Sequence, residues 1–297
     1  MSNAFRVTQR SIASTVLTGV QGNLARLGDT QQRLSSGKTI SRASDSPTGA
    51  VSAMQYRSDI ALADQYSRNA DDGLGWLATA DTALTSVVTQ TQRARELVLQ
   101  GMSSGTGGSA EARDAIAAEI DGIRQSMIST ANTSYLGRPV FGGTTAGAAA
   151  YAPDGTYAGD TGTVTRTVGD NTRVRVDTGG PDVFGTGTTQ LFTVLGDIAN
   201  DLRNNPAALG GDLGRLDTAR ETVQAGLSTV GARYNQVDKM RQAAQDRALS
   251  LTSRLSDVED VDLPKTLTDL QLQQTAYQAA LAAGARIVQS SLMDFLR

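Results

Sequence analysis

Residues 13–34, with the sequence ASTVLTGVQGNLARLGDTQQRL, decide how this chain folds. Seam positions recur there in alternating steps of four and three, at Ala13, Leu17, Val20, Leu24, Leu27, Gln31 and Leu34. This spacing keeps the side chains on one helix face and is typical of a coiled-coil seam. The stretch therefore predicts a helix of about 25 residues or more. We expect it to stop at Gly37, because glycine readily adopts the backbone conformation that ends a helix.

The other end of the chain carries a second seam. Pro264 follows a cluster of acidic residues and cannot lie inside an unbroken helix without a kink, so we predict a break there and then a last helix. Its seam is Leu267, Leu270, Gln274, Tyr277, Leu281, Gly284, Val288, Ser291 and Phe295. Chain ends are commonly polar and frayed. A seam that continues to the last residues therefore predicts that this end is buried against something.

Longer helices lie between the two ends. Asp45 or Ser46 is a suitable N-cap and Pro47 suits the first helical turn, and the helix that follows continues to about Gln100. After Pro206 a further helix of roughly 45 residues, about 65 Å long, is predicted. The seam residues are Leu77, Ala80, Leu84, Val87, Thr91, Ala94 and Val98 in the first helix, and Leu216, Val223, Leu227, Val230, Tyr234, Val237, Ala244, Ala248, Leu251 and Leu255 in the second. Helices of this length predict a rod.

The middle of the chain differs in composition. Residues 137–188 are dominated by Gly, Thr, Asp and Val, and the alternating runs 163–168 and 172–176 flank a turn, which predicts a β-hairpin. The expected fold is mainly α, a long antiparallel helical rod of coiled-coil type with a small β insertion lobe. The expected domains are paired terminal helices at 1–45 and 260–297, a helical rod domain at 46–136 and 189–259, and the β lobe at 137–188.

Composition argues against catalysis. The 297 residues include no His and no Cys, which removes the commonest general base, metal ligand and thiol nucleophile. An enzyme carried on the β lobe would need clustered carboxylates and hydroxyls within 139–188, and none is evident. The glycines at 73–75 and 101–108 lack the Lys-Ser/Thr of a phosphate loop. The acids at 257–262 lack the pattern of a calcium loop, and we interpret them as a solvated hinge. We expect no catalytic residue, cofactor or metal.

Charge and hydropathy argue against further classes of protein. The net charge is −3 and no polybasic run occurs, so a nucleic-acid partner is not expected. No run of about 18 or more apolar residues is present, so we expect no membrane span. The N-terminus also lacks the apolar core and cleavage site of a secretory signal, so any export would use another route.

The seams at both chain ends predict assembly. Isolated helices are marginal in water, and most of their stability comes from burying a face. Pairing the two end helices would still leave apolar flanks, formed by Ile12, Val16, Leu263, Leu272, Ile287 and Leu292, which repeated subunits around an axis would cover. The expected interface is Ala13, Leu17, Val20, Leu24, Leu27, Leu34, Leu267, Leu270, Tyr277, Leu281, Val288 and Phe295. Gln31 and Gln274 are either tolerated on these seams or set their register.

Three stretches resemble the flagellin family. They are LSSGKTISRASDSPTGAVSAMQYRSDI at 34–60, SRNADDGLGWLATADTALTSVVTQTQRARELVLQG at 67–101 and SRLSDVEDVDLPKTLTDLQLQQTAYQAALAAGARIVQSSLMDFLR at 253–297. Within the family, TSYLGRPVFGGTTAGAAAY at 133–151 and the ending SSLMDFLR are more similar to the hook–filament junction class. The alternative is a short filament subunit.

The resemblance implies a structural, non-catalytic and cofactor-free component of the bacterial flagellum. It implies a ring of identical subunits between hook-associated protein 1 and flagellin, with the paired terminal helices forming an inner tube. It also implies a cytoplasmic chaperone and export through the flagellar type III apparatus to an extracellular position, without a cleaved signal peptide.

Overall fold

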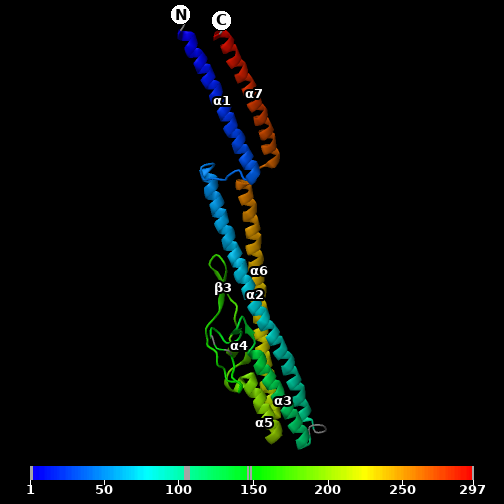
Figure 1. The fold of residues 1–297 in the computed structure, drawn as a ribbon. Helices are drawn as coiled ribbons and strands as arrows, with labels where there is room; N and C mark the ends of the chain where they lie inside the picture. Colours follow the sequence, from blue (N-terminus) through cyan, green and yellow to red (C-terminus); the bar gives the residue numbers. More distant parts are fainter. Residues whose placement is uncertain (1–2, 104–107, 146, 148, 296–297) are drawn as a thin grey trace. The chain divides into compact units, whose positions relative to one another are not determined.

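The computed structural model describes residues 3–103, 108–145, 147 and 149–295, and the side chains of 11 and 14–286 within them. The chain divides into two compact units, one formed by residues 1–61 and 248–297 and the other by residues 62–247. The elements, shown in Figure 1, are α1 (Asn3–Ser36), α2 (Pro47–Met102), α3 (Ala110–Ala131), β1 (Ser134–Tyr135), β2 (Arg138–Pro139), β3 (Thr165–Gly169), β4 (Thr172–Arg175), α4 (Gly180–Phe184), α5 (Leu191–Asn204), α6 (Leu209–Glu259) and α7 (Leu263–Phe295). Short 3₁₀ turns precede α5 at Gly187–Thr189 and α6 at Pro206–Ala208. The prediction of a mainly helical chain with a small β region is confirmed.

The unit that holds the chain ends contains α1, α7 and the neighbouring turns of α2 and α6. Antiparallel α1 and α7 pack along each other (Figure 1). As predicted, α1 stops before Gly37, whose positive φ of 70° is the left-handed conformation that glycine adopts at low cost. Ser46 caps α2, because its hydroxyl accepts a hydrogen bond of 3.2 Å from the Gly49 amide. The predicted break before Pro264 is confirmed, and Asp262 caps the helix that follows.

The other unit is a helical core with a β lobe. All the seam residues predicted for α2 are buried, including Leu77, Leu84 and Val98. On α6, Val223, Val230 and Val237 are buried, but Tyr234 is 39% exposed, so that prediction is wrong. Val230 and Val237 lie seven residues apart, close to two helical turns, whereas Tyr234 lies on an adjacent, solvent-facing row. α3 and α5 pack against each other within the same core.

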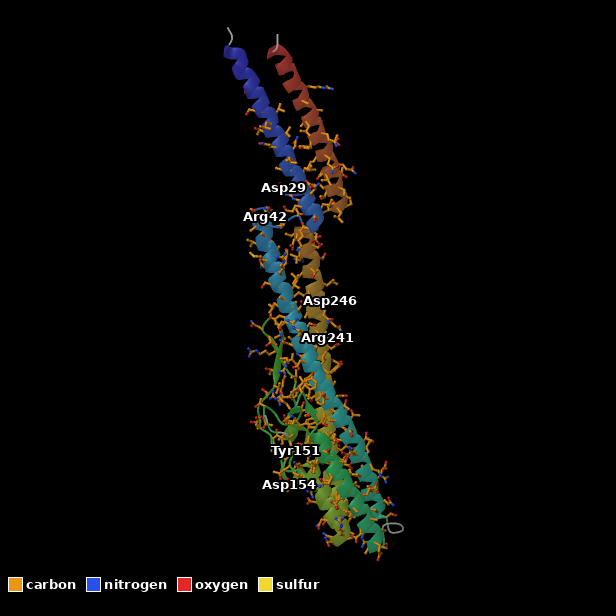
Figure 2. All side chains as sticks on the ribbon, viewed as in Figure 1. Asp29, Arg42, Tyr151, Asp154, Arg241 and Asp246 are labelled. Atoms are coloured by element: carbon orange, nitrogen blue, oxygen red, sulfur yellow. The ribbon has the colours of Figure 1, made fainter. Side chains whose placement is uncertain are left out.

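The β lobe consists of two short hairpins and irregular chain. β3 and β4 form the predicted hairpin, with an irregularity between Thr167 and Gly169 and with Asn171 in the left-handed conformation at the turn. β1 and β2 form a second, unpredicted hairpin. The lobe has an aromatic centre, in which the Tyr151 ring packs edge-on against Phe184 and Phe192. Figure 2 places Tyr151 among these loops.

Buried Asp177 anchors the lobe. Its carboxylate accepts hydrogen bonds from the Val164 amide at 2.8 Å and from the Arg175 side chain at 3.1 Å. The Arg233 guanidinium on α6 donates to the Asp177 carbonyl oxygen at 2.6 Å. The buried charge is thus hydrogen-bonded on more than one side, as burial of a carboxylate requires. Within the described part of the chain, no helix combines the length and apolar character needed to cross a membrane.

Candidate assembly interface

The pairing of α1 with α7 buries one narrow row on each helix. On α1 the covered positions are Val16, Val20, Asn23, Leu27, Thr30 and Leu34, and on α7 they are Thr266, Leu270, Gln273, Tyr277, Ala280 and Gly284. Both rows advance in steps of four and three, which is the spacing of a two-helix seam. The helices approach closely near Gly284, since a Cβ atom there would lie 3.2 Å from Val16 Cγ1. We call these two rows the inner rows.

A polar contact crosses the inner rows. Thr30, only 8% exposed, donates a hydrogen bond of 2.8 Å from its hydroxyl to Oε1 of Gln273. The predicted polar seam residues Gln31 and Gln274 are instead exposed, each one residue further along its helix. The structure thus contains a polar layer in the helix pair, one residue before the predicted position on each helix. Polar layers of this kind fix the register of paired helices.

The residues expected at an assembly interface divide into three groups. Val20, Leu27, Leu34, Leu270 and Tyr277 are half-buried on the inner rows. Leu17, Leu24, Leu267 and Leu281 are 59%, 52%, 47% and 45% exposed. The side chains of Ala13, Val288 and Phe295 lie outside the described residues.

The exposed leucines on each helix lie outside the inner rows. Leu17 and Leu24 lie one heptad apart on α1, whereas Leu267 and Leu281 lie two heptads apart on α7 with the exposed Gln274 between them. Of the flanking residues predicted to face solvent, Leu263 and Leu272 are 51% and 67% exposed. Val16, in contrast, is half-buried against α7, and the side chains of Ile12, Ile287 and Leu292 lie outside the described residues. The helix pair therefore leaves large apolar side chains uncovered.

The turns at the base of the helix pair are joined by backbone hydrogen bonds. The Thr39 amide donates to the Glu259 carbonyl at 2.7 Å, and the Val261 amide donates to the Gly37 carbonyl at 3.0 Å. The Thr39 hydroxyl adds a bond of 3.0 Å to the Asp260 carbonyl. These bonds tie the segment that follows α1 to the segment that precedes α7, so the two terminal helices share one base.

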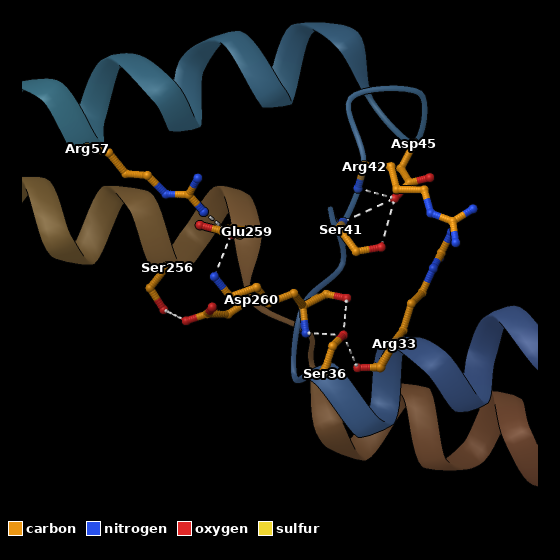
Figure 3. Close-up of polar contacts among 10 residues, drawn as sticks. Arg33, Ser36, Ser41, Arg42, Asp45, Arg57, Ser256, Glu259 and Asp260 are labelled. Carbon is orange, nitrogen blue, oxygen red and sulfur yellow. Dashed lines mark hydrogen bonds and ion pairs between the residues drawn. The ribbon is translucent and has the colours of Figure 1, made fainter.

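A buried carboxylate lies at this base. Glu259 is 5% exposed and forms ion pairs with Lys38, at 2.6 Å, and with Arg57 on α2 (Figure 3). We call the three residues the Glu259 latch. The sequence interpretation of 257–262 as a solvated hinge is wrong for Glu259, because two cations from the opposite arm cover it. It holds for Asp257, Asp260 and Asp262, which are exposed.

Asp45 organises the turn between α1 and α2. Its carboxylate accepts hydrogen bonds from the Arg42 amide at 2.8 Å and from the amide and hydroxyl of Ser41, both at 3.1 Å (Figure 3). The backbone amides of Arg42 and Ser41 lower the pKa of Asp45 below its ordinary value, so the carboxylate is charged at neutral pH. The turn is therefore held by an acceptor that is charged at neutral pH.

The features of this unit suit association between helices. Among the residues that the structure describes, no group of three or more acidic side chains is arranged to hold a metal ion. Apolar stripes, a polar register contact and an ion-paired base are features of helices that pair. Sequence reasoning missed Lys38, Arg57 and Glu259, although opposite charges next to the two predicted helix breaks were a usable signal.

Comparison with known proteins agrees with this description. The family model for the bacterial flagellin N-terminal helical region matches residues 7–146, and the model for the C-terminal helical region matches residues 213–296. The chain is 25% identical to flagellar hook-associated protein 3 of Escherichia coli, over 90% of this chain and 92% of the relative. It is also 25% identical to flagellin of Bacillus subtilis, over 98% of this chain and 100% of the relative.

A solved structure shares the fold. It is that of a putative flagellar hook-associated protein from Vibrio parahaemolyticus, and it superposes with a TM-score of 0.66 at 19% identity. The match covers 73% of this chain and all of the other. At this level of identity the likeness concerns the arrangement of helices and lobe.

Proposed function

Because the chain belongs to the bacterial flagellin family, we propose that it is a structural adaptor that joins the hook-associated ring to the flagellin filament. The observation that carries the proposal is the stripe of exposed leucines on a helix pair that is otherwise joined along its length. Complete burial of one leucine side chain contributes about 1.5–3 kcal/mol. Leu17, Leu24, Leu267 and Leu281 are each about half exposed, so covering them in an assembly would yield a substantial part of that energy.

The interface would use both rows of each helix. We propose that the residues on the inner rows, such as Val20, Leu27 and Tyr277, hold α1 to α7 within one subunit. Leu17, Leu24, Leu267 and Leu281 would contact neighbouring subunits, as would Ala13, Val288 and Phe295. This division supports the proposed domains, in which 1–45 and 260–297 assemble, 46–136 and 189–259 form a helical spacer, and 137–188 forms a lobe.

The proposed partners follow from this role. They are further copies of the same chain, hook-associated protein 1 on one side and flagellin on the other. A cytoplasmic chaperone would cover the leucine stripes before assembly, because large exposed apolar surfaces favour aggregation. Export through the flagellar type III apparatus, without a cleaved signal peptide, would place the protein outside the cell. No catalytic role is proposed.

The second candidate function is that of a short flagellin. It is favoured by the full-length alignment with the Bacillus subtilis protein. The junction function is favoured by the hook-associated relatives and by the segment 133–151, which contains Phe141-Gly142-Gly143. In the fold these three residues are buried next to the second hairpin, where Phe141 packs edge-on against Phe184.

Two measurements separate the candidates. Cells that lack the protein should build hooks and release flagellin into the medium, and a plasmid copy should restore filaments. Purified protein added to filament seeds should not extend them into long filaments. Normal filaments in the deletion strain would refute the junction function, and efficient seeded growth of the purified protein would establish the flagellin alternative.

A further inference from the structure

A pocket of about 370 Å³ lies beside the Glu259 latch, within the unit that holds the chain ends. Its apolar lining comes from Ile40 in the turn after α1 and from Ala50, Ala53 and Met54 on the first turns of α2. Met54 is 62% exposed, and Val51, one helical turn earlier, is 60% exposed. We call this feature the turn pocket. It presents apolar surface that the unit itself leaves uncovered.

The turn pocket carries an excess of positive charge. Lys38, Arg42 and Arg57 line it, and Glu259 is its one acidic lining residue. Glu259 is nearly inaccessible, whereas the side chains of Lys38 and Arg57 stay 44% and 51% exposed although both pair with it. One carboxylate shared by two cations leaves charge uncompensated, and Arg42 adds a third cation, whose charge Asp45 in the same turn offsets in part. Figure 2 shows Arg42 in the turn between α1 and α2. The pocket is thus suited to an occupant that is both acidic and apolar.

The chain itself contains a segment of that kind. The turn between α6 and α7 presents Asp257, Asp260 and Asp262 as exposed side chains, followed by Leu263, which is 51% exposed. Within one copy only Glu259 of this segment lines the turn pocket. Asp260 accepts a hydrogen bond from the Ser256 hydroxyl and Asp262 caps α7, so Asp257 and Leu263 are the side chains that remain available to a second copy.

We propose that the turn pocket of one copy receives the acidic α6–α7 turn of a neighbouring copy, with Leu263 against Met54 and carboxylates facing Arg42. This inference rests on the proposed function and names a contact within the ring. Pocket and turn are different surfaces, so the contact is heterologous. Repeated heterologous contacts close into a ring or continue as a helix, according to the rotation between copies. The proposed adaptor requires such repetition.

Engineered cysteines test the contact directly, because the natural chain contains none. In flagella isolated from cells that produce the double variant Met54→Cys/Leu263→Cys, a short bismaleimide should give a ladder at multiples of the chain mass. A mixture of the two single variants should stop at dimers, and each single variant alone should give monomers. As a matched control, Leu249→Cys/Leu263→Cys pairs Leu263 with a residue that is 72% exposed on α6 but absent from the pocket lining, and it should give no ladder.

A charge reversal provides independent support. Arg42→Asp should lower incorporation at the junction about tenfold, which corresponds to about 1.4 kcal/mol, and Asp257→Arg in the same chain should restore much of it. Circular dichroism of the purified variants would verify that they fold.

The outcomes separate this inference from the proposed function. If the double-cysteine protein is present at the junction but gives no ladder, the pocket contact is wrong and the adaptor function stands. Cross-linking by Met54→Cys alone, or to a protein of another mass, would also overturn the contact. If the natural chain is absent from the junction altogether, the proposed function fails. A ladder formed by purified self-assembled protein would then still support the contact.

Discussion

The hydroxyl of Thr30 on α1 donates a hydrogen bond of 2.8 Å to the side-chain oxygen of Gln273 on α7, across 243 positions of sequence. The inner rows on either side of this layer carry Leu27 and Leu34 on α1 and Leu270 and Tyr277 on α7. Apolar contacts tolerate sliding, whereas a donor and an acceptor lose their partner when one helix shifts along the other. The contact therefore selects one register among several that apolar packing alone would permit.

Thr30→Val tests this layer, because it keeps the shape of the side chain and removes the donor. We expect the α1–α7 pair to lose about 0.5–1.5 kcal/mol. Amide exchange in the middle of α1 should accelerate accordingly, by about twofold to tenfold, since 1.4 kcal/mol corresponds to a factor of ten. Thr18→Val is the control, because the Thr18 hydroxyl bonds only to the Ser14 carbonyl on its own helix. Equal effects of the two variants would contradict a role in pairing.

Glu259→Gln should loosen the base of the terminal helices. The substitution leaves Lys38 and Arg57 without their shared anion, but both are half exposed, so water compensates part of the loss. We expect a cost of about 1–2 kcal/mol, below the range for a fully buried pair. Thermal unfolding and amide exchange at Thr39 and Val261 would measure it. The control is Glu96→Gln, since the ion pair of Glu96 with Arg93 is exposed on both sides and should contribute less than about 0.5 kcal/mol.

The helical part of the fold could be predicted from the sequence because α2 buries its whole predicted seam and α6 buries most of its valines. Leu77, Leu84 and Val98 recur at helical spacing, and the apolar row beside them, which includes Trp76 and Leu97, is buried as well, so periodicity identifies the buried face. The β1–β2 hairpin could not be predicted, because each of its strands has only two residues and gives no alternation to count. The break before Pro264 was predictable from local backbone chemistry.

The terminal seams were harder, because each helix carries two apolar stripes. The spacing of the leucines predicted that Leu24 and Leu281 lie on the seams. In the structure, the neighbouring Asn23 and Ala280 are the residues that the helix pair covers. Periodicity gives the width of an apolar face but not which part of it meets the partner helix. The Glu259 latch escaped prediction for a related reason. The opposite charges beside the two predicted helix breaks were the available signal, but Lys38 and Glu259 lie 221 positions apart in the sequence, so their contact follows only once the two turns are paired.

Asp160 should make the lobe sensitive to acid. Its carboxylate accepts hydrogen bonds from the Thr144 amide at 2.7 Å, the Thr144 hydroxyl at 2.8 Å and the Gly162 amide at 2.9 Å, and the Thr144 amide is the main cause of a lowered pKa. The pKa of Asp160 in the folded protein lies below the unfolded value of about 3.9, so the stability that its carboxylate gives to the lobe is fully present above that pH. This stability is lost as the pH falls through the lowered pKa.

Protection of the Thr144 and Gly162 amides from exchange should therefore be constant from about pH 5 to 8 and fall below about pH 4. Asp160→Asn should weaken protection at every pH and remove the acid-dependent step. Asp81→Asn, on an exposed position of α2, should leave the profile unchanged. Loss of protection already near pH 6 would show that another group controls the loop.

Leu24→Asp and Leu281→Asp should block incorporation into the flagellum without unfolding the subunit. Both leucines are about half exposed in the single chain, so losing the covered half and the helix propensity of leucine should lower its stability by about 1–2 kcal/mol, less than the total stability of a typical domain. In an assembly that covers them, an unpaired carboxylate would cost several kcal/mol, and a loss of about 3 kcal/mol corresponds to roughly a hundredfold lower incorporation. Swimming in soft agar and the amount of protein in isolated flagella measure this effect, and circular dichroism measures folding.

Leu136→Asp is the matched control. Leu136 is 80% exposed in the β1–β2 turn, and its positive φ of 50° suits aspartate, so this variant should assemble normally. Normal assembly of Leu24→Asp and Leu281→Asp would mean that these stripes stay in solvent and that the subunits meet through another surface.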